Sequence, residues 1–221
     1  SIENGAFYNC TGLTSIEIPD SVTSIGIGAF QDCSSLASIN IPSSVTSIGN
    51  CAFYNCTGLT SIEIPEGVTS IGIYAFSGTP WLTSKQNENP LVIVNGILID
   101  GTACSGEVTI PNDVTSIGVS AFQNCTGLTN ITISKSVASV GESAFSGCDN
   151  LTEVLLEGGS TLTSENFGEV ADKVVTRWNE GDLTWTLTAD GTMTISGTGA
   201  MKNYDANNSP VAQKTDSVKK L

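Results

Sequence analysis

A motif with a period of 23 residues constrains the fold of this chain more than any other feature. Residues 62–76 read Ile-Glu-Ile-Pro-Glu-Gly-Val-Thr-Ser-Ile-Gly-Ile-Tyr-Ala-Phe, and residues 16–30 and 39–53 repeat this string with few changes. The second half of the motif returns at 114–122 and 137–145. A fixed period of this size is typical of solenoid proteins, in which each repeat packs only against its neighbours.

Each repeat contains two segments that we expect to be extended. The alternation of Ile16 and Ile18 predicts a short strand with one buried face. Because proline cannot donate to a strand ladder, this segment ends at the prolines, which are Pro19, Pro42, Pro65 and Pro111. The Val-Thr-Ser-Ile run that follows has β-branched residues between its apolar positions and predicts a second short extended segment.

A turn closes each repeat. Glycines are expected where a side chain would be costly, at Gly26, Gly49, Gly72, Gly118 and Gly141. The Ala-Phe-x-x-Cys string that follows predicts a tight turn or a single 3₁₀ turn that directs Phe and Cys inward. Because a single repeat cannot bury two faces alone, stacking must place Ile on Ile and Phe on Phe. We therefore predict a repeat solenoid, a right-handed coil of 23-residue units made mainly of short parallel strands and turns.

Residues 77–105 depart from the motif. Counting on by 23 residues still places Leu82 and Val94 on apolar positions of the repeat. We therefore expect one or two irregular coils here, and not a free loop, with residues 79–81 and 85–90 bulging outward.

The consensus Ile-Pro-x-x-Val-Thr-Ser-Ile-Gly-x-x-Ala-Phe-x-x-Cys-x-x-Leu resembles the BspA-like class of leucine-rich repeats over residues 1–157. The variant Gly-Thr-Pro-Trp-Leu at 78–82 is similar to an irregular repeat of that family. The resemblance implies a surface or secreted protein, usually bacterial, with an adhesive or host-binding role. It implies no catalytic residues and no cofactor.

The charge of the chain excludes two classes of partner. The formal net charge is −14 and the sequence pI is near 4.1, whereas nucleic acids and anionic lipids are bound through Lys/Arg surfaces. No apolar run approaches the ~18 residues of a membrane span, so direct membrane insertion is not expected. Ile2 occupies the repeat position of Ile25, so the sequence starts within a repeat. We interpret it as a fragment of a longer protein whose signal peptide lies outside it.

Five cysteines share one repeat position and predict an inward-facing column of reduced thiols. They are Cys10, Cys33, Cys56, Cys125 and Cys148. Side chains that point the same way on stacked coils would strain a disulfide, whereas a buried free cysteine packs as a small apolar residue. Cys51 and Cys104 lie off this column, and we expect them at more exposed positions.

The repeat motif is lost toward the C-terminus, and this divides the chain into three regions. We expect a solenoid of about seven coils over 1–157, a capping segment over 158–182, and a β-hairpin module with a polar tail over 183–221. The spacing of apolar residues over 166–178 predicts a helix, with Asn166 and Glu169 as its capping box. The alternative is a degenerate last coil, and either would cover the open end of the solenoid.

The alternation over 183–196 predicts a β-hairpin, and a similar hairpin commonly accompanies BspA-like repeats. A loop of the three residues 189–191 would place Leu187 opposite Met193, which keeps the apolar side chains on one face. A two-residue loop would break this arrangement. We therefore expect the three-residue loop, with Gly191 in a left-handed conformation.

The chain has no histidine, which removes the catalytic triads that need one and the commonest metal ligand. The strongest enzymatic candidates are Glu17 and Glu63, a carboxylate pair at one repeat position two coils apart, as in a glycan hydrolase. The coil between them carries Asn40, and a flat strand face offers no desolvating pocket for a catalytic acid. We therefore expect no enzyme.

The outward positions beside each strand remain as candidates for binding. The predicted ligand-facing residues are Ser15, Glu17, Ser38, Asn40, Ser61, Glu63, Thr109, Asn130 and Thr132. Solenoid faces of this kind bind extended partners, so we expect an adhesin-like module, extracellular or on the cell surface, whose partner is a protein or a glycan. The alternative is a purely structural spacer, in which Ser/Thr rows merely keep the array soluble.

The first coil is expected to be exposed on one side. Residues 16–18 would lack an outer partner, and Phe7, Leu13 and Ile25 would lack a covering coil. An unpaired apolar edge is a template for pairing with another chain. We expect this end either to fray or to associate end to end with a second copy.

Overall fold

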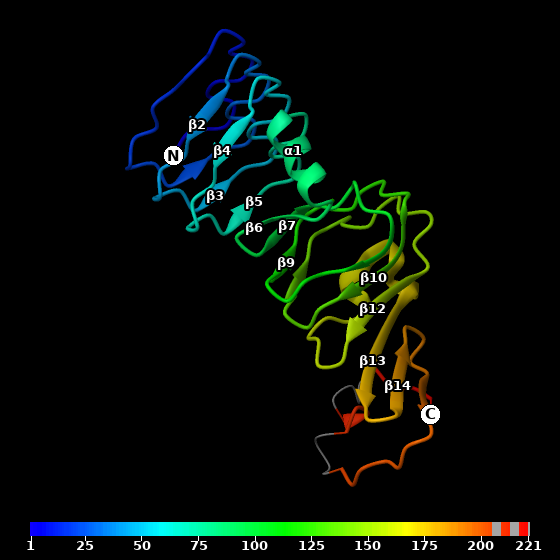
Figure 1. The fold of residues 1–221 in the computed structure, drawn as a ribbon. Coiled ribbons are helices and arrows are strands. Elements are labelled where there is room, and N and C mark those ends of the chain that lie inside the picture. The colour runs from blue at the N-terminus through cyan, green and yellow to red at the C-terminus, as the bar shows by residue number, and fades with distance from the viewer. Residues whose placement is uncertain (205–208, 213–216, 221) are drawn as a thin grey trace. The chain divides into compact units, whose positions relative to one another are not determined.

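The computed structural model describes residues 1–204, 209–212 and 217–220. These residues form two compact units, which are coloured along the chain in Figure 1. The first unit comprises Ser1–Ala103 with Gly118–Ala121, and the second comprises Cys104–Ile117 with Phe122–Leu221. The units are described separately below.

Two sets of short parallel strands build the first unit (Figure 1). One set contains β2 (Ser38–Asn40) and β4 (Ser61–Glu63), and the other contains β1 (Ser24–Ile25), β3 (Ser47–Ile48) and β5 (Ser70–Ile71). Ile39 pairs with Ile62, and both are buried. The two extended segments predicted for each repeat are therefore confirmed in these coils.

Residues 16–18 do not form the predicted strand. Ile18 is nevertheless buried, with 7% of its surface exposed. The alternation thus predicted which side chain points inward. It did not predict the ladder, because ladder hydrogen bonds also need two backbones in register.

A column of phenylalanines forms the core of the first unit. The ring centroids of Phe7 and Phe30 lie 5.1 Å apart, those of Phe30 and Phe53 lie 5.3 Å apart, and those of Phe53 and Phe76 lie 5.6 Å apart. Phe30 and Phe53 are fully buried. The inward direction predicted for the phenylalanines is therefore confirmed.

The repeat glycines permit close approach between coils. A Cβ on Gly49 would lie 2.7 Å from the carbonyl carbon of Gly26, and a Cβ on Gly72 would clash with the backbone nitrogen of Asn50. Real Cβ atoms do not approach so closely, so a side chain here would push neighbouring coils apart. A side chain at these glycine positions is therefore unfavourable, as predicted, but the reason is a clash with the backbone of the adjacent coil.

Residues 77–105 contain regular elements instead of outward bulges. Helix α1 (Pro80–Glu88) is followed by β6 (Val92–Val94) and β7 (Ile97–Asp100), which pair antiparallel. The predicted bulge at 79–81 is wrong, because Thr79 and Trp81 are buried. The stretch 85–90, which was also predicted to bulge outward, contains the end of α1, and residues 87–90 are exposed. The hydroxyl of Thr79 caps the helix by accepting from the backbone nitrogen of Leu82 at 3.1 Å.

The second unit contains a six-stranded sheet in the order β8–β10–β12–β13–β14–β15 (Figure 1). Its strands are β8 (Gly106–Thr109), β10 (Leu128–Ile133), β12 (Glu153–Glu157), β13 (Val174–Glu180), β14 (Leu183–Thr188) and β15 (Met193–Gly197). The first four strands pair in parallel and the last two are antiparallel. A second parallel pair joins β9 (Ser116–Ile117) and β11 (Ser139–Val140).

The segment predicted as a helix over 166–178 divides into two elements. A 3₁₀ helix, η1 (Ser164–Lys173), comes first, and the remaining residues belong to β13. Gly168 has a φ of 51° and interrupts the helix, and the β-branched run from Val174 to Thr176 favours a strand. The predicted capping box is also wrong, since Asn166 pairs with Thr163 and not with Glu169.

The predicted hairpin is confirmed in its register. Leu187 lies opposite Met193 and Trp185 opposite Ile195. The three-residue loop holds Gly191 at a φ of 85°. Ile195 remains 44% exposed because β15 is an edge strand of the sheet, so the apolar face is not buried along its whole length.

The carboxylate of Asp190 holds the hairpin loop. It accepts from the backbone nitrogen of Thr192 at 3.0 Å and from the hydroxyl of Thr188 at 2.6 Å. These bonds lower the pKa of Asp190 from 3.8 to about 2, and the bond from the Thr188 hydroxyl makes the largest contribution.

Stacked coils are also joined through their cysteines. The thiol of Cys33 donates to the carbonyl oxygen of Phe7 at 3.1 Å, and that of Cys56 to the carbonyl oxygen of Phe30 at 2.9 Å. The second unit repeats this bond from Cys148 to Phe122 at 3.0 Å. All seven cysteines are free thiols in the structure.

Two of the predicted cysteine positions are wrong. Cys10 is exposed, because no neighbouring coil covers the outer side of the coil that contains it. Cys104 is buried, although it lies off the cysteine column. Cys104 has a structural role in the second unit, where its carbonyl oxygen accepts from the thiol of Cys125 at 3.1 Å.

The outer side of the first coil is covered in part. Ile2 forms a parallel bridge with Ile25, and its backbone nitrogen donates to the carbonyl oxygen of Ser24 at 2.9 Å. Ile25 is consequently only 1% exposed, so the prediction that it lies uncovered is wrong. Phe7 and Leu13 are half-buried.

Candidate interaction surface

Four of the predicted surface residues lie together on β2 and β4 of the first unit. Ser38 pairs with Ser61 and Asn40 pairs with Glu63, and all four side chains are exposed. The buried residues between them direct these side chains to the opposite face, as the pleat of a strand requires. Ser15 and Glu17 are exposed as well but lie outside any strand. The ladder does not bring them into register with the other rows.

The remaining three predicted residues lie on the six-stranded sheet of the second unit. Thr109 on β8 pairs with Thr132 on β10, and Asn130 pairs with Glu107. Thr109 is exposed, whereas Asn130 and Thr132 are half-buried. The parallel pairing therefore aligns these polar side chains across neighbouring strands.

The sheet continues this surface onto β12 and β13. Asn130 pairs with Glu153 on β12, and Thr132 pairs with Leu155. Glu157 then pairs with Arg177 on β13. The contribution of β13 was missed because its residues were assigned to a helix.

A groove of about 770 Å³ crosses this outer face. Its lining combines polar and charged residues with Leu155, Leu156 and Trp178. The polar and charged residues are Thr132, Lys135, Glu157, Arg177, Asn179 and Thr184. The volume lies within the range of sites that hold small molecules or segments of polymers. A partner laid across the strands would contact hydroxyl, amide and guanidinium groups in one place.

Arg177 and Glu157, which both line this groove, have partners within the protein. Nη2 of Arg177 lies 2.7 Å from Oε2 of Glu153, and the backbone nitrogen of Lys135 donates to Oε2 of Glu157 at 3.2 Å. The Arg177 and Glu153 side chains are 37% and 28% exposed. An exposed pair of this kind contributes about 0.2–1 kcal/mol, so it can exchange partners with a ligand at small cost.

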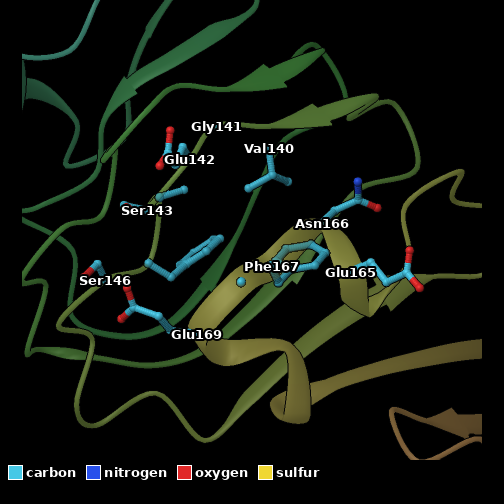
Figure 2. A pocket seen from close by; sticks show the side chains of 12 residues that line it. Val140, Gly141, Glu142, Ser143, Ser146, Glu165, Asn166, Phe167 and Glu169 are labelled. Atoms are coloured by element: carbon cyan, nitrogen blue, oxygen red, sulfur yellow. The ribbon is translucent and has the colours of Figure 1, made fainter.

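A second hollow of about 270 Å³ lies between η1 and residues 140–146. Figure 2 shows Phe167 at its centre, with the carboxylates of Glu142, Glu165 and Glu169 pointing in different directions. Within the part of the chain that the structure describes, no group of His, Cys, Asp and Glu side chains is arranged to hold a metal ion. This hollow is therefore not a metal centre of the described residues.

The carboxylate pair proposed for catalysis lies in open solvent. Glu17 and Glu63 are both exposed, and Asn40 pairs with Glu63 on the adjacent strand. A catalytic acid requires an enclosed, desolvating environment, which neither exposed position provides.

None of the described helices combines the length and the apolar character needed to cross a lipid bilayer. A search of the curated proteins found no match.

Several solved bacterial structures are similar to this chain. A leucine-rich repeat protein from Bacteroides ovatus is 26% identical over 72% of this chain and 38% of its own, with a TM-score of 0.41. The T. pallidum leucine-rich repeat protein is 28% identical over 71% and 66%, with a TM-score of 0.40. A leucine-rich cell surface protein from Faecalibacterium prausnitzii is 25% identical over 79% and 62%, with a TM-score of 0.41. The chain thus spans between 38% and 66% of the lengths of these three proteins.

The family assignment rests on the repeats themselves. The sequence model of the BspA type leucine-rich repeat region matches six copies in this chain, over residues 1–95 and 101–170. These ranges cover strands β1 to β6, strands β8 to β12 and most of η1. The chain belongs to the BspA-type leucine-rich repeat family.

Proposed function

We propose that this chain is a non-enzymatic interaction module of a bacterial cell-surface or secreted protein. It binds an extended extracellular protein or glycan through the outward faces of its parallel strands. The observation that carries this proposal is the grooved outer face of the six-stranded sheet, where Thr132, Leu155 and Arg177 lie on adjacent strands. A surface of this form offers an extended partner repeated contacts from one strand to the next.

The chemistry of the surface restricts the partner. The chain carries 22 acidic and 8 basic residues, so a polyanion would be repelled over most of the surface. The exposed rows on β2 and β4 present hydroxyl, amide and carboxylate groups. Such groups form hydrogen bonds with peptide backbones and with sugar hydroxyls alike.

The family also supports finer features of the fold as part of this proposal. We propose that the array is a right-handed coil with a 23-residue unit, and that η1 and the hairpin cap its C-terminal end. Phe167 of η1 supports the cap, because its ring lies 5.9 Å from that of Phe145 and continues the aromatic column. The domain limits 1–157, 158–182 and 183–221 belong to this proposal.

A purely structural spacer is the alternative. The exposed serines at Ser38 and Ser61 favour it, because short hydroxyl side chains keep a repeat array soluble and contribute little contact area. The two functions differ in one measurable property, since a spacer has no specific ligand.

A binding screen separates the two. The purified chain is tested against an array of extracellular-matrix proteins and glycans, and any ligand is retested with the variants Thr132→Trp and Ser139→Trp. The first places an indole in the groove, and the second places one on β11, where Ser139 is exposed. We expect Thr132→Trp to weaken binding at least tenfold and Ser139→Trp to leave it unchanged. An array without binding above background would favour the spacer.

A further inference from the structure

The turns of stacked coils are joined by a ladder of backbone hydrogen bonds. In the first unit, the nitrogen of Phe30 donates to the carbonyl oxygen of Ala52 at 2.8 Å. In the second unit, the nitrogen of Phe122 donates to the carbonyl oxygen of Ala144, also at 2.8 Å. Each turn therefore directs these N–H groups toward the next coil, and that coil supplies the acceptors.

The last turn of the second unit has donors without acceptors. Phe145 and Gly147 occupy the ladder positions of Phe122 and Asn124, 23 residues further along the chain. Among the described residues, none accepts a hydrogen bond from the backbone nitrogen of Phe145 or of Gly147. Phe145 is only 3% exposed, and a buried N–H group without an acceptor is rare in folded proteins. The turn thus presents an open end of the ladder.

The hollow of about 270 Å³ beside η1 lies next to this open end, since Phe145 and Ser146 belong to its lining. The segment η1 covers the core here through Phe167, whose ring lies 5.9 Å from that of Phe145. No carbonyl group of η1 accepts from the described residues of the turn. The cap therefore covers the aromatic column and leaves the backbone donors available to a ligand.

The preceding turn shows what fits these donors. The nitrogens of Phe122 and Asn124 donate to the carbonyl oxygens of Ala144 and Ser146, which lie two residues apart on one backbone. An extended peptide segment presents carbonyl oxygens with this alternation, and hydrogen bonds of this kind provide affinity when a peptide is added to an open ladder. The volume lies near the lower end of the ~300–1,000 Å³ typical of ligand sites, so the hollow suits a few residues and not a folded coil.

The charge of the hollow restricts the side chains of such a peptide. Its described lining includes the exposed residues Glu142, Glu165 and Glu169 but neither lysine nor arginine. Figure 2 shows Glu142 and Glu169 on the same side of the Phe167 ring as Ser146. These carboxylates repel an anionic acceptor such as a phosphate and attract a cation. The ligand must therefore combine neutral carbonyl acceptors with positive charge.

We infer that this hollow is a docking site for a short extended segment of a partner protein that carries Lys or Arg side chains. The carbonyl oxygens of the segment accept from the nitrogens of Phe145 and Gly147. Its basic side chains pair with Glu142 and Glu169. The site lies on the turn side of the last coil and not on a strand face, so it stands or fails independently of the proposed function.

A second copy of this chain is a poorer occupant. Phe167 already covers Phe145, so the first coil of another copy could not continue the aromatic column there. Each copy also carries a net charge of −14, and two such chains repel each other.

The test uses the full chain and three probes. The basic probe is an acetylated and amidated pentapeptide, Ala-Lys-Ala-Lys-Ala, and the acidic probe has Glu in place of Lys. Cadaverine, which has two ammonium groups and no carbonyl, is the third. We expect only the basic peptide to shift the amide signals of Phe145 and Gly147 in NMR spectra and to slow their hydrogen exchange. The amide of Phe53, which donates to the carbonyl oxygen of Ala75 at 2.8 Å, is the matched control and should not respond.

Three results would overturn the inference. The first is a basic peptide that leaves the amides of Phe145 and Gly147 unchanged. The second is an equal response to the acidic peptide or to cadaverine, because the site would then not require both carbonyl groups and positive charge. The third is a response of these amides to protein concentration alone, with dimers seen by light scattering, which would assign the hollow to a second copy.

Variants locate the contact. Glu142→Gln combined with Glu169→Gln should weaken binding of the basic peptide at least fivefold. The matched control combines Glu17→Gln with Glu63→Gln, which removes the same charge from exposed positions of the first unit and should stay within twofold. An equal loss in both would show unspecific attraction and refute the site. Thr132→Trp should retain full affinity, and a loss there would assign the peptide to the sheet instead.

Discussion

The side-chain amide of Asn55 donates to the carboxylate of Asp32 on the preceding coil at 2.7 Å. Both residues adopt the left-handed backbone conformation, with φ values of 55° and 61°. The same repeat position is left-handed in six coils, at Asn9, Asp32, Asn55, Gly78, Asn124 and Gly147. Only Asn, Asp and Gly appear there because these residues tolerate positive φ better than other types. The repeat motif thus encodes a backbone requirement.

The first prediction concerns this position. Asn55→Ala should destabilise the protein by about 1–2 kcal/mol, because alanine is strained in the left-handed conformation and lacks the amide that donates to Asp32. Asn55→Gly keeps the backbone conformation and removes only an exposed hydrogen bond, so it should cost about 0.5–1 kcal/mol. Urea denaturation of both variants measures the difference. Equal losses would show that the hydrogen bond, and not the backbone, dominates.

The second prediction concerns a left-handed residue that lacks this tolerance. Cys51 has a φ of 54°, at the position where other coils carry Gly5 and Gly28. Cys51→Gly should be more stable than Cys51→Ala by about 1 kcal/mol, since both remove the thiol and only glycine relieves the strain. Thermal unfolding compares them. An alanine variant as stable as the glycine variant would show that the coil relaxes without cost.

The third prediction concerns the phenylalanine column. Phe53 is fully buried and stacks between Phe30 and Phe76, so Phe53→Ala should cost about 3–5 kcal/mol. Its neighbour Tyr54 is 38% exposed, and Tyr54→Ala should change stability by less than ~0.5 kcal/mol. Chemical denaturation of the pair provides the check. Comparable losses would mean that the column contributes no more than the surface does.

The column was predictable from the sequence for a specific reason. Each coil contacts only its neighbours, so a side chain repeated at one position must stack on its own copies. Phe30 and Ile39 could therefore be placed before the structure was known. The glycine contacts were harder to predict, because the 2.7 Å approach at Gly49 depends on how tightly two coils pack.

The errors arose where a local signal opposed the repeat. Thr79 and Pro80 start a helix that the repeat register does not contain, and the residues after Lys173 form a strand in place of the expected helix. Exposure of Asn40 and Glu63 followed from strand alternation alone. The hollow beside η1 did not, because residues such as Ser146 and Phe167 come from separate elements that only the folded chain brings together.

The fourth prediction concerns thiol reactivity. Burial is the main cause that raises the pKa of Cys56 from 9.0 to about 12 and that of Cys148 to about 11. Iodoacetamide at pH 8 should therefore label the exposed Cys10 in the native protein and leave Cys56 and Cys148 unmodified, as mass spectrometry would show. Unfolding without reductant should expose seven reactive thiols. A count of one would reveal three disulfides.

The same pKa values predict how stability depends on pH. The thiol of Cys56 has a higher pKa in the folded state than its value of 9.0 in the unfolded state, so its contribution to the free energy of unfolding is fully present below pH 9.0. That contribution is lost as the pH rises from 9.0 through about 12, because the unfolded thiol ionises first. The free energy of unfolding should fall over this range, and the fall should be smaller in Cys56→Ala. An identical slope in the variant would contradict the assignment.

The fifth prediction concerns the outer side of the first coil. Phe7 and Leu13 are half-buried there, and residues 16–18 form no strand. By contrast, β4 pairs with β2 and β5 pairs with β3 of the preceding coil, and the nitrogen of Thr69, just before β5, donates to the carbonyl oxygen of Thr46 at 2.9 Å. Amides of residues 14–18 in dilute monomer should therefore exchange at least tenfold faster than those of β4 and β5.

Protein concentration separates fraying from association at this end. If a second copy covers Phe7 and Leu13, protection of residues 14–18 should rise with concentration while light scattering reports a dimer. If the end only frays, protection stays low and the mass stays that of a monomer. Phe7→Ser removes an apolar contact at this edge and should abolish any dimer, since unpaired apolar edges drive such pairing. Protection of residues 14–18 equal to that of β4 in a dilute monomer would contradict both outcomes and show that the first coil is as stable as the interior of the array.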